Sequence, residues 1–405
     1  MKILVLNCGS SSIKYALYNM DDKSVITSGG IEKIGLSDSF IKIKTPSGEK
    51  ITIHHPIIEH TEGVQYILNC LTQGDYAVIK DLTEIDAVGH RMVHGGERFS
   101  KSVLLTDNVM EAFARCNDLA PLHNPANIKG VNAVKTCCGD IPQVGVFDTA
   151  FHQTMPDYAF MYALPYDLYE RYGVRRYGFH GTSHRYVSQR VIEFLKQHKP
   201  SAVNHTSSLK MITCHIGGGA SITAIKDGKC IDTSMGLTPL EGLIMGTRSG
   251  DIDAGAVTFL MNKEHLNTTD ISNLLNKKSG LAGVSGGKSD FRDILAAIDS
   301  GDDRARLAKQ MYTYRIKKYI GSYAAALGGI DIIVFTGGAG ENQWEVREGA
   351  TAGLEFIGVK IDKTRNHSVR ATESIISTDD SPVTVCVIPT DEELMIAEDT
   401  LALTK

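Results

Sequence analysis

Three glycine-rich turns, each following a short apolar stretch, constrain the fold of this chain more than any other feature of its sequence. The apolar stretches occupy residues 3–6, 211–216 and 332–336, and their lengths and composition predict buried strands. Glycine lets successive backbone N–H groups turn inward and approach an anion closely, which makes such turns suitable for phosphate. Three of them in one chain predict a polyphosphate that is held from several sides.

Length and composition describe an ordinary globular protein. The 405 residues, 42% hydrophobic and 22% charged, are enough for roughly two to three domains at about 150 residues each. The net charge of −5 gives no indication of a nucleic-acid or membrane-surface partner, and no apolar run approaches the ~20 residues of a membrane span. The N-terminus lacks signal-peptide anatomy, and eight cysteines without a Cys-x-x-Cys pair predict reduced thiols in a cytoplasmic protein.

The first two turns lie within similar units of the sequence. In each unit a strand is followed by a glycine turn and by a second strand, expected at residues 13–18 and 221–225, and Asp227-Gly228 predicts a hairpin after the latter. This weak internal repeat favours two similar halves. Further elements expected from the pattern are strands at 144–147 and 383–388, a helix over 301–327, a helix from 390 onward, and a polar connection at 200–208.

Polar side chains crowd the first turn. Asn7, Ser10, Ser12 and Lys14 offer an amide, two hydroxyls and an ammonium, which could orient a phosphoryl group and its Mg²⁺. The alternative is ordinary turn chemistry, because Asn and Ser often hydrogen-bond to their own backbone. The position of Lys14 directly behind the turn favours the phosphate interpretation.

Two arginines sit beside glycines and are candidates for anion binding. Arg91 and Arg248 each carry a planar guanidinium that matches carboxylate and phosphate oxygens. The alternative is a salt bridge within a loop, for which Asp251 and Asp253 are available. Spacing alone leaves this choice open.

Two carboxylates follow predicted strands, at the edge where ligands approach an α/β sheet. Asp148 could hold Mg²⁺ or a reacting group. Glu392 has a structural alternative: with Thr390 as N-cap, Glu393 completes a capping box and Glu392 suits the helix dipole. The residues alone favour that alternative for Glu392. His180 and His184 share the spacing of zinc-binding histidines, but the glutamate of the zincin motif is missing and no zinc site is expected.

Taken together, these residues closely resemble the acetokinase family, within the sugar kinase, Hsp70 and actin superfamily. The resemblance runs almost end to end. The matching segments are residues 7–14 (NCGSSSIK), 89–96 (GHRMVHGG), 120–125 (APLHNP), 146–152 (VFDTAFH), 177–184 (YGFHGTSH), 233–250, 290–292 (DFR), 340–342 (GEN) and 389–393 (PTDEE).

The resemblance implies an α/β fold of two similar domains of the actin-like ATPase (ribonuclease H-like) type with a central cleft. The N-terminal domain would comprise residues 1–150 plus 385–405. The C-terminal domain would comprise residues 151–384 and carry the nucleotide site and a dimer interface, since family members are usually homodimers.

The resemblance also assigns roles to single residues. It implies that Asp148, His180 and Arg248 are catalytic, that Asn7 and Glu392 lie near Mg²⁺, which Mn²⁺ could replace, and that Glu392 is therefore more than a helix-cap residue. It implies a substrate site formed by Arg91, Val93, Leu122, His123, Phe179 and Pro239. The implied nucleotide contacts are Ser10, Ser12, Lys14, His215, Ile216, Gly217, Gly218, Gly219, Asp290, Phe291, Arg292, Gly338, Ala339, Gly340, Glu341 and Asn342.

The implied activity is reversible, direct in-line phosphoryl transfer from ATP to acetate, giving acetyl phosphate and ADP, with no nucleic-acid or membrane partner. The implied acyl pocket consists of four apolar residues and leaves room for a methyl group; they are Val93, Leu122, Phe179 and Pro239. One extra methylene on the substrate changes the discrimination between two acids by only ~1–3 kcal/mol, so propionate should be a poorer substrate rather than an excluded one. The family commonly has Asn where this chain has Gly218, which leaves its phosphoryl-donor preference open. The rivals are an ATP-operated clamp and a propionate or butyrate kinase.

Overall fold

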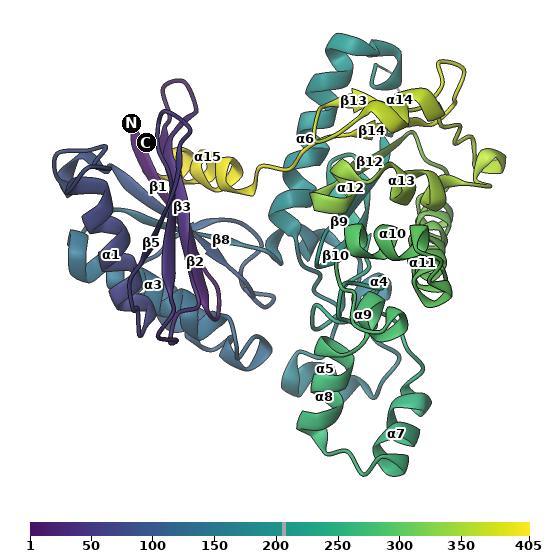
Figure 1. The fold of residues 1–405 in the computed structure, drawn as a ribbon, viewed down its shortest axis with the longest axis horizontal. Helices are drawn as coiled ribbons and strands as arrows, with labels where there is room; N and C mark the ends of the chain where they lie inside the picture. Colours follow the sequence, from purple (N-terminus) through teal and green to yellow (C-terminus); the bar gives the residue numbers. More distant parts are fainter. Residues whose placement is uncertain (205–207) are drawn as a thin grey trace. The chain divides into compact units, whose positions relative to one another are not determined.

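A computed structural model describes residues 1–204 and 208–405, and the chain divides into two compact units (Figure 1). The first comprises Met1–Phe151 and Asp391–Lys405, and the second comprises His152–Thr390. Strand β14 (Thr384–Val387) pairs with β12 (Ile332–Thr336) of the second unit. The chain therefore returns to the first unit at Asp391, and not at residue 385 as the sequence suggested.

The first unit is built on an eight-stranded sheet with the order β5-β4-β3-β2-β1-β6-β8-β7. Its strands are β1 (Lys2–Cys8), β2 (Ser12–Asn19), β3 (Ser24–Glu32), β4 (Phe40–Lys44), β5 (Lys50–His54), β6 (Ala87–Met92), β7 (Val103–Leu104) and β8 (Gln143–Phe147). Its helices are α1 (His60–Thr72), α2 (Asp107–Ala114), α3 (Asn124–Cys138) and α15 (Glu392–Thr404).

Both faces of this sheet are covered around its central strand β1, whereas the outer strands β4 and β5 carry exposed residues. Because side chains alternate along a strand, Leu4 and Leu6 of β1 join the core on the side of α1, whereas Ile3 and Val5 join the core that includes Ile396 of α15. Helix α15 packs on β1, β6 and β8 (Figure 1). A side chain at Gly89 of β6 would place its Cβ 2.4 Å from the Thr400 hydroxyl, so the absence of a side chain there lets α15 approach the sheet.

The second unit repeats the plan of the first. Its six-stranded sheet has the order β11-β10-β9-β12-β14-β13, formed by β9 (Lys210–Ile216), β10 (Ala220–Lys226), β11 (Lys229–Thr233), β12, β13 (Ser374–Ile375) and β14. In both units an antiparallel three-stranded meander is followed by two parallel strands, β6 and β8 in the first and β12 and β14 in the second. This is the arrangement expected of two similar actin-like, ribonuclease H-like domains.

The local signals for the second unit are confirmed. Asp227 and Gly228 have φ angles of 51° and 75°, as a two-residue hairpin turn with both residues left-handed requires. The helix expected over 301–327 is α11 (Asp303–Leu327), capped by the Asp302 side chain, which accepts a hydrogen bond from the Ala305 N–H. The expected connection at 200–208 contains a short 3₁₀ helix, Pro200–Ala202, and its residues 205–207 lie outside the described part of the chain.

The remaining helices of the second unit surround its sheet and extend below it in the view of Figure 1. They are α4 (Asp157–Phe160), α5 (Tyr166–Tyr172), α6 (Gly181–His198), α7 (Ala254–Lys263), α8 (Thr268–Lys277), α9 (Gly280–Ser285), α10 (Phe291–Asp299), α12 (Gly337–Asn342), α13 (Trp344–Thr351) and α14 (Lys363–Ser368). Within the described residues, no helix is long and apolar enough to cross a membrane.

The start of α15 differs from the sequence prediction. Its N-cap is Asp391, whose carboxylate accepts a hydrogen bond from the Leu394 N–H, and not Thr390. The shift moves Glu393 to the second helical position, so the expected capping box does not form. The physical reason is that the Thr390 hydroxyl is already hydrogen-bonded to Ser183 Oγ at 2.8 Å within the second unit.

Candidate functional site

Three of the predicted site residues meet in the first unit, at the carboxyl ends of the parallel strands β1, β6 and β8. Arg91 Nε lies 3.0 and 3.1 Å from the two carboxylate oxygens of Asp148, and Arg91 Nη2 lies 2.6 Å from Asp148 Oδ2. Arg91 Nη1 donates to Asn7 Oδ1 at 3.2 Å. The Asn7 side chain therefore bonds to Arg91 rather than to its own backbone, which excludes simple turn chemistry for this residue.

The Arg91–Asp148 pair leaves part of the guanidinium available. Asp148 is 1% exposed, and the Arg91 side chain is 26% exposed. Burial disfavours the charged guanidinium, but the adjacent Asp148 carboxylate outweighs it and raises the pKa of Arg91. Of the five N–H donors of an arginine, three are used by Asp148 and Asn7, so two remain for a ligand within the described part of the chain. Arg91 thus does form a salt bridge, as the alternative interpretation expected, but the salt bridge does not use all the N–H donors of the guanidinium.

Glu392, the first residue of α15, adds a second carboxylate to this cluster. Burial raises the pKa of the Glu392 carboxyl to about 7; Arg91 opposes this shift, and Asp148 and Glu393 add to it. Such mutual repulsion among carboxylates is relieved by a bound cation. Among the described residues, no three His, Cys, Asp or Glu side chains form a complete metal-binding set. The oxygens present suit Mg²⁺, which typically takes one or two carboxylates and completes its coordination with phosphates and water.

The first glycine turn lies beside this cluster. The Gly9 N–H donates to the Ser12 carbonyl at 2.8 Å, which closes the turn, and Lys14 stands opposite Asn7 in the antiparallel pairing of β1 with β2. Ser10 and Lys14 are exposed. Their side chains form no hydrogen bond with the described residues and are available to a ligand.

The expected apolar substrate residues differ in their surroundings. In the first unit Val93 is 7% exposed and Leu122 is 71% exposed, while His123 directly precedes α3. In the second unit Phe179 is buried and Pro239 half-buried. Within each unit, therefore, one of the two apolar side chains is covered and the other is more accessible to solvent.

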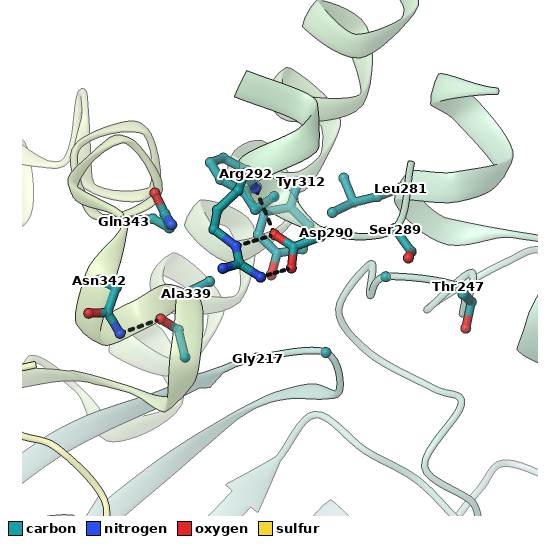
Figure 2. A pocket seen from close by; sticks show the side chains of 14 residues that line it. Gly217, Thr247, Leu281, Ser289, Asp290, Arg292, Tyr312, Ala339, Asn342 and Gln343 are labelled. Atoms are coloured by element: carbon teal, nitrogen blue, oxygen red, sulfur yellow. Dashed lines mark hydrogen bonds and ion pairs between the residues drawn. The ribbon is translucent and has the colours of Figure 1, made fainter. Parts of the chain in front are cut away.

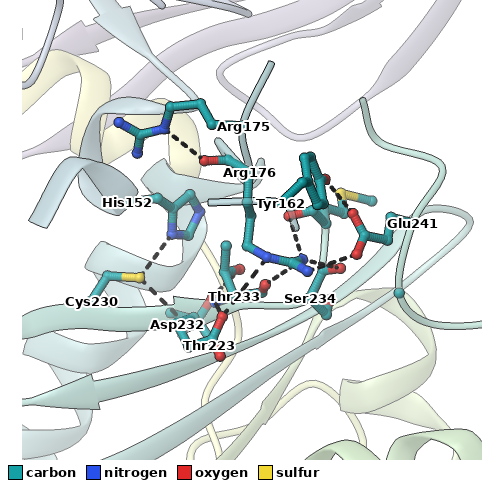
Figure 3. A network of polar contacts seen from close by, with 12 residues as sticks. His152, Tyr162, Arg175, Arg176, Thr223, Cys230, Asp232, Thr233, Ser234 and Glu241 are labelled. Carbon is teal, nitrogen blue, oxygen red and sulfur yellow. Dashed lines mark hydrogen bonds and ion pairs between the residues drawn. The ribbon is translucent and has the colours of Figure 1, made fainter. Parts of the chain in front are cut away.

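His180 in the second unit has a strained backbone. Its φ of 58° places it in the left-handed region at the N-cap of α6, a conformation that non-glycine residues adopt chiefly where surrounding contacts impose it. One such contact comes from buried His152, whose Nε2 lies 3.0 Å from the carbonyl oxygen of Phe179. The other ring nitrogen of His152, Nδ1, lies 3.3 Å from Cys230 Sγ (Figure 3). The His180 ring stacks on His215 at a centroid distance of 4.2 Å.

Arg248 has no carboxylate partner among the described residues. Its Nη1 donates to the Pro239 carbonyl at 3.1 Å, and burial lowers the pKa of its guanidinium. The salt-bridge alternative is wrong for Arg248: Asp251 pairs with Arg315 at 3.3 Å, and Asp253 caps α7. A partly buried cation without a counterion is ready to receive an anion.

The second glycine turn brings Arg248 and His180 to one point. A Cβ added to Gly219 would lie 3.4 Å from His180 Nε2 and 3.6 Å from Arg248 Nη1. The turn predicted to hold phosphate is thus directly adjacent to both residues predicted to stabilise the transferring phosphoryl group.

Arg176, a half-buried arginine that the sequence did not single out, fixes the loop that carries Pro239. Arg176 donates to the carbonyls of residues 233–235 at 2.9 to 3.2 Å and forms an ion pair with Glu241 at 2.6 Å, and Glu241 in turn accepts from the Tyr162 hydroxyl (Figure 3). Arg176, which stands between Arg175 and Tyr177, gave no signal in the sequence, because its role depends on carbonyls that only the fold assembles.

The nucleotide-binding segments predicted in the second unit line one pocket with a volume of about 610 Å³ (Figure 2). The predicted residues that line it are Gly217, Gly218, Gly338, Ala339, Asn342 and residues 290–292. This volume lies within the range of small-molecule sites. The sequence missed the remaining lining residues, which are Gly246, Thr247, Leu281, Ser289, Tyr312 and Gln343.

Some predicted nucleotide residues support the pocket without lining it. Ile216 is fully buried in β9, and the backbone of Gly340 is buried within α12. The Glu341 carboxylate accepts hydrogen bonds from the Gly337 N–H at 2.8 Å and the Thr390 N–H at 3.1 Å. The third turn is therefore the start of a helix, held in place by Glu341.

Comparison with known proteins identifies the family. The model of the acetokinase family matches residues 2–398. The chain belongs to the acetokinase family. The acetate kinase of Bacteroides thetaiotaomicron is 69% identical over 405 residues, covering 100% of both chains. The crystal structure of Porphyromonas gingivalis acetate kinase has a TM-score of 0.95 at 55% identity and covers 100% of both chains. A propionate kinase from Francisella tularensis has a TM-score of 0.90 at 41% identity, with 99% of each chain covered.

Membership confirms the resemblance drawn from the sequence motifs, together with the fold of two similar actin-like domains. The family match extends over residues 2–398, so the glycine turns, Arg91, Asp148 and Arg248 all lie within the matched region. The relatives include both an acetate and a propionate kinase. Family membership therefore leaves the preferred acyl group to be decided by experiment.

Buried neutral histidines predict a loss of stability in mild acid. Burial lowers the pKa of His90 and of His152 from 6.5 to about 4. Between these values the unfolded chain binds more protons than the folded one, so the free energy of unfolding decreases as the pH falls from 6.5 toward 4, by on the order of 2–3 kcal/mol for each histidine. Urea unfolding between pH 6.5 and 5 should show this slope. His90→Gln should reduce it, whereas substitution of the exposed His54 should not; equal slopes in all three proteins would contradict the prediction.

Proposed function

We propose that this protein catalyses reversible phosphoryl transfer between ATP and acetate, giving ADP and acetyl phosphate. The observation that carries the proposal is the convergence of the 217–219 turn, His180 and Arg248 beside the 610 Å³ pocket, with no carboxylate paired to Arg248 among the described residues. Phosphoryl transfer depends mainly on positioning and on stabilising charge at the equatorial oxygens. Full-length relatives named acetate kinase, at up to 69% identity, support the same activity.

The residues have distinct tasks in this mechanism. The two remaining N–H donors of Arg91 bind the acetate carboxylate, and Arg248 and His180 donate to the transferring phosphoryl group. Acetate is already ionised at neutral pH, because an ordinary carboxylic acid has a pKa near ~4, so no strong general base is required. Asp148, with both oxygens engaged by Arg91, orients Arg91 rather than removing a proton.

Asn7 and Glu392 are the residues that would hold Mg²⁺, together with Asp148. The metal ion, when bound, neutralises charge on the phosphate oxygens. Ser10, Ser12 and Lys14 supply hydroxyl and ammonium donors at the neighbouring turn. The raised pKa of Glu392 supports this assignment, since a carboxylate crowded by two others gains most from a cation.

Acetate is the favoured acyl substrate, and propionate is the second candidate because of the resemblance to a propionate kinase. The test is a hydroxylamine trap, in which purified protein receives ATP, Mg²⁺ and a series of straight-chain acids. Acetate should give the highest kcat/KM, with a loss of about tenfold or more for each added methylene. A higher value for propionate would overturn the acyl assignment.

The same assay separates a kinase from an ATP-operated clamp. A kinase forms hydroxamate and ADP in equal amounts and stops when Mg²⁺ is chelated. Hydrolysis of ATP without hydroxamate, at all chain lengths, would contradict phosphoryl transfer and favour the clamp.

We also propose a homodimer formed through the second unit. This unit exposes aromatic side chains that are more than half accessible to solvent, namely Tyr158, Tyr166, Tyr172, Phe259 and Tyr314. Exposed apolar groups of this size commonly mark protein interfaces. Light scattering should give roughly twice the chain mass of 44.1 kDa, and Phe259→Glu or Tyr314→Glu should shift it toward the monomer. A monomeric wild-type protein at micromolar concentration would exclude the dimer.

A further inference from the structure

Four polar side chains of the second unit form a continuous hydrogen-bonded line that includes His180. Thr213 Oγ1 lies 2.7 Å from His184 Nδ1, His184 Nε2 lies 2.8 Å from Ser221 Oγ, and Ser221 Oγ lies 2.8 Å from His180 Nδ1. Thr213, His184 and Ser221 are each 0% exposed. The mechanism described above uses only the last member of this line.

The direction of the hydrogen bonds is fixed at Thr213. Its hydroxyl has one side-chain partner among the described residues, His184 Nδ1. If the hydroxyl accepted a proton from Nδ1, its own proton would be buried without an acceptor, and that costs ~1–3 kcal/mol. The Thr213 hydroxyl therefore donates to His184 Nδ1.

His184 accepts a hydrogen bond at one ring nitrogen and donates one at the other, because its ring is neutral. Burial, with smaller contributions from His152 and His215, lowers the pKa of His184 well below its ordinary value. A neutral imidazole carries one proton, and with Nδ1 accepting, that proton is on Nε2. His184 Nε2–H then donates to Ser221 Oγ.

Ser221 completes the line, because a hydroxyl has a single proton to donate. With one lone pair accepting from His184, Ser221 O–H donates to His180 Nδ1. When the His180 ring is neutral, it then carries its proton on Nε2. This is the nitrogen 3.4 Å from the Cβ position of Gly219, beside Arg248.

We propose that Ser221 and His184 are positioning residues, which orient the His180 ring and keep its proton on Nε2 as a donor toward the transferring phosphoryl group. This proposal rests on the proposed function for the role of His180. The predicted tautomers of His180 and His184 do not depend on the reaction, so they can be tested without measuring turnover.

The direct test is ¹⁵N NMR of protein labelled in its histidines. The ring signals of His180 and His184 are assigned by their disappearance in His180→Gln and His184→Gln. At neutral to mildly alkaline pH both rings should appear as the neutral tautomer protonated on Nε2. A proton on Nδ1 of either ring would overturn the proposal, whatever reaction the enzyme catalyses.

The kinetic test compares Ser221→Ala with Thr223→Val. Both changes remove a fully buried hydroxyl from β10, but Thr223 bonds to Thr233 and not to a histidine. Ser221→Ala should lower kcat about 10- to 100-fold through misplacement of the donor, with KM for ATP and acetate nearly unchanged, while Thr223→Val stays near wild type. An unchanged kcat in Ser221→Ala, or an equal loss in both variants, would overturn the proposal.

A second pair keeps the test decisive if Ser221→Ala fails to fold. In His184→Gln the amide can still donate to Ser221, whereas in His184→Leu nothing can. We expect the glutamine variant to retain several-fold more kcat than the leucine variant at similar thermal stability, and equal values would contradict the relay. Absence of acetate phosphorylation by the wild-type protein would instead refute the proposed function. The NMR test of the tautomers would remain valid in that case, because it does not depend on the activity.

Discussion

Replacing Arg248 with alanine is expected to lower kcat by about a thousandfold or more, because removing a donor aimed at developing phosphoryl charge typically costs two to five orders of magnitude. KM for acetate should change far less. Arg248 forms no ion pair with the described residues and donates only to the Pro239 carbonyl and the Met245 sulfur. Its loss should therefore cost at most about 1 kcal/mol of stability, so steady-state kinetics and a urea midpoint together isolate the catalytic effect.

Arg304 offers a matched control for this experiment. It too donates to main-chain carbonyls, those of Gly283 and Val284, but it does not line the nucleotide pocket. Arg304→Ala should retain near wild-type kcat, and Arg248→Lys should recover part of the loss as a charge without the planar fork. A large rise in acetate KM with kcat preserved in Arg248→Ala would refute the assignment of Arg248 to the phosphoryl group.

Replacing Arg91 with alanine is expected to raise KM for acetate by about ten- to a hundredfold, because a charge-assisted hydrogen bond contributes ~1.5–3 kcal/mol. KM for ATP should change much less. The measurement is initial rate against acetate concentration at saturating ATP. An unchanged acetate KM would remove Arg91 from the substrate site.

Stability complicates this variant and provides its control. Arg91→Ala leaves the Asp148 carboxylate, which is 1% exposed, without its cation, and breaking a buried pair in this way costs ~3–5 kcal/mol. Arg91→Ala combined with Asp148→Ala removes the unpaired charge and should recover much of that stability while the acetate KM stays high. Recovery of the KM along with the stability would show that Arg91 acts only through folding.

Local patterns were sufficient for much of the architecture. The strands at β1, β2, β9 and β10, the hairpin at Asp227-Gly228 and the long helix α11 all follow from short-range periodicity and turn residues. Longer motifs such as residues 89–96 identified the family. Where a side chain had two possible partners, the sequence was ambiguous: Thr390 was expected to cap α15, but its hydroxyl bonds to Ser183, and Asp391 caps the helix instead.

The sequence by itself determined which chemical groups are present, and the periodicity and turns that place them at strand ends. Only the tertiary structure decided how these groups pair. It directs Arg91 to Asp148 and leaves Arg248 without a carboxylate partner in the part of the chain that the structure describes, although the two arginines have similar glycine-rich neighbours. It also aligns Thr213, His184, Ser221 and His180, which come from three separate segments. Hydrogen bonds and ion pairs depend on distances between residues far apart in the chain, and those distances are set by how strands and helices pack.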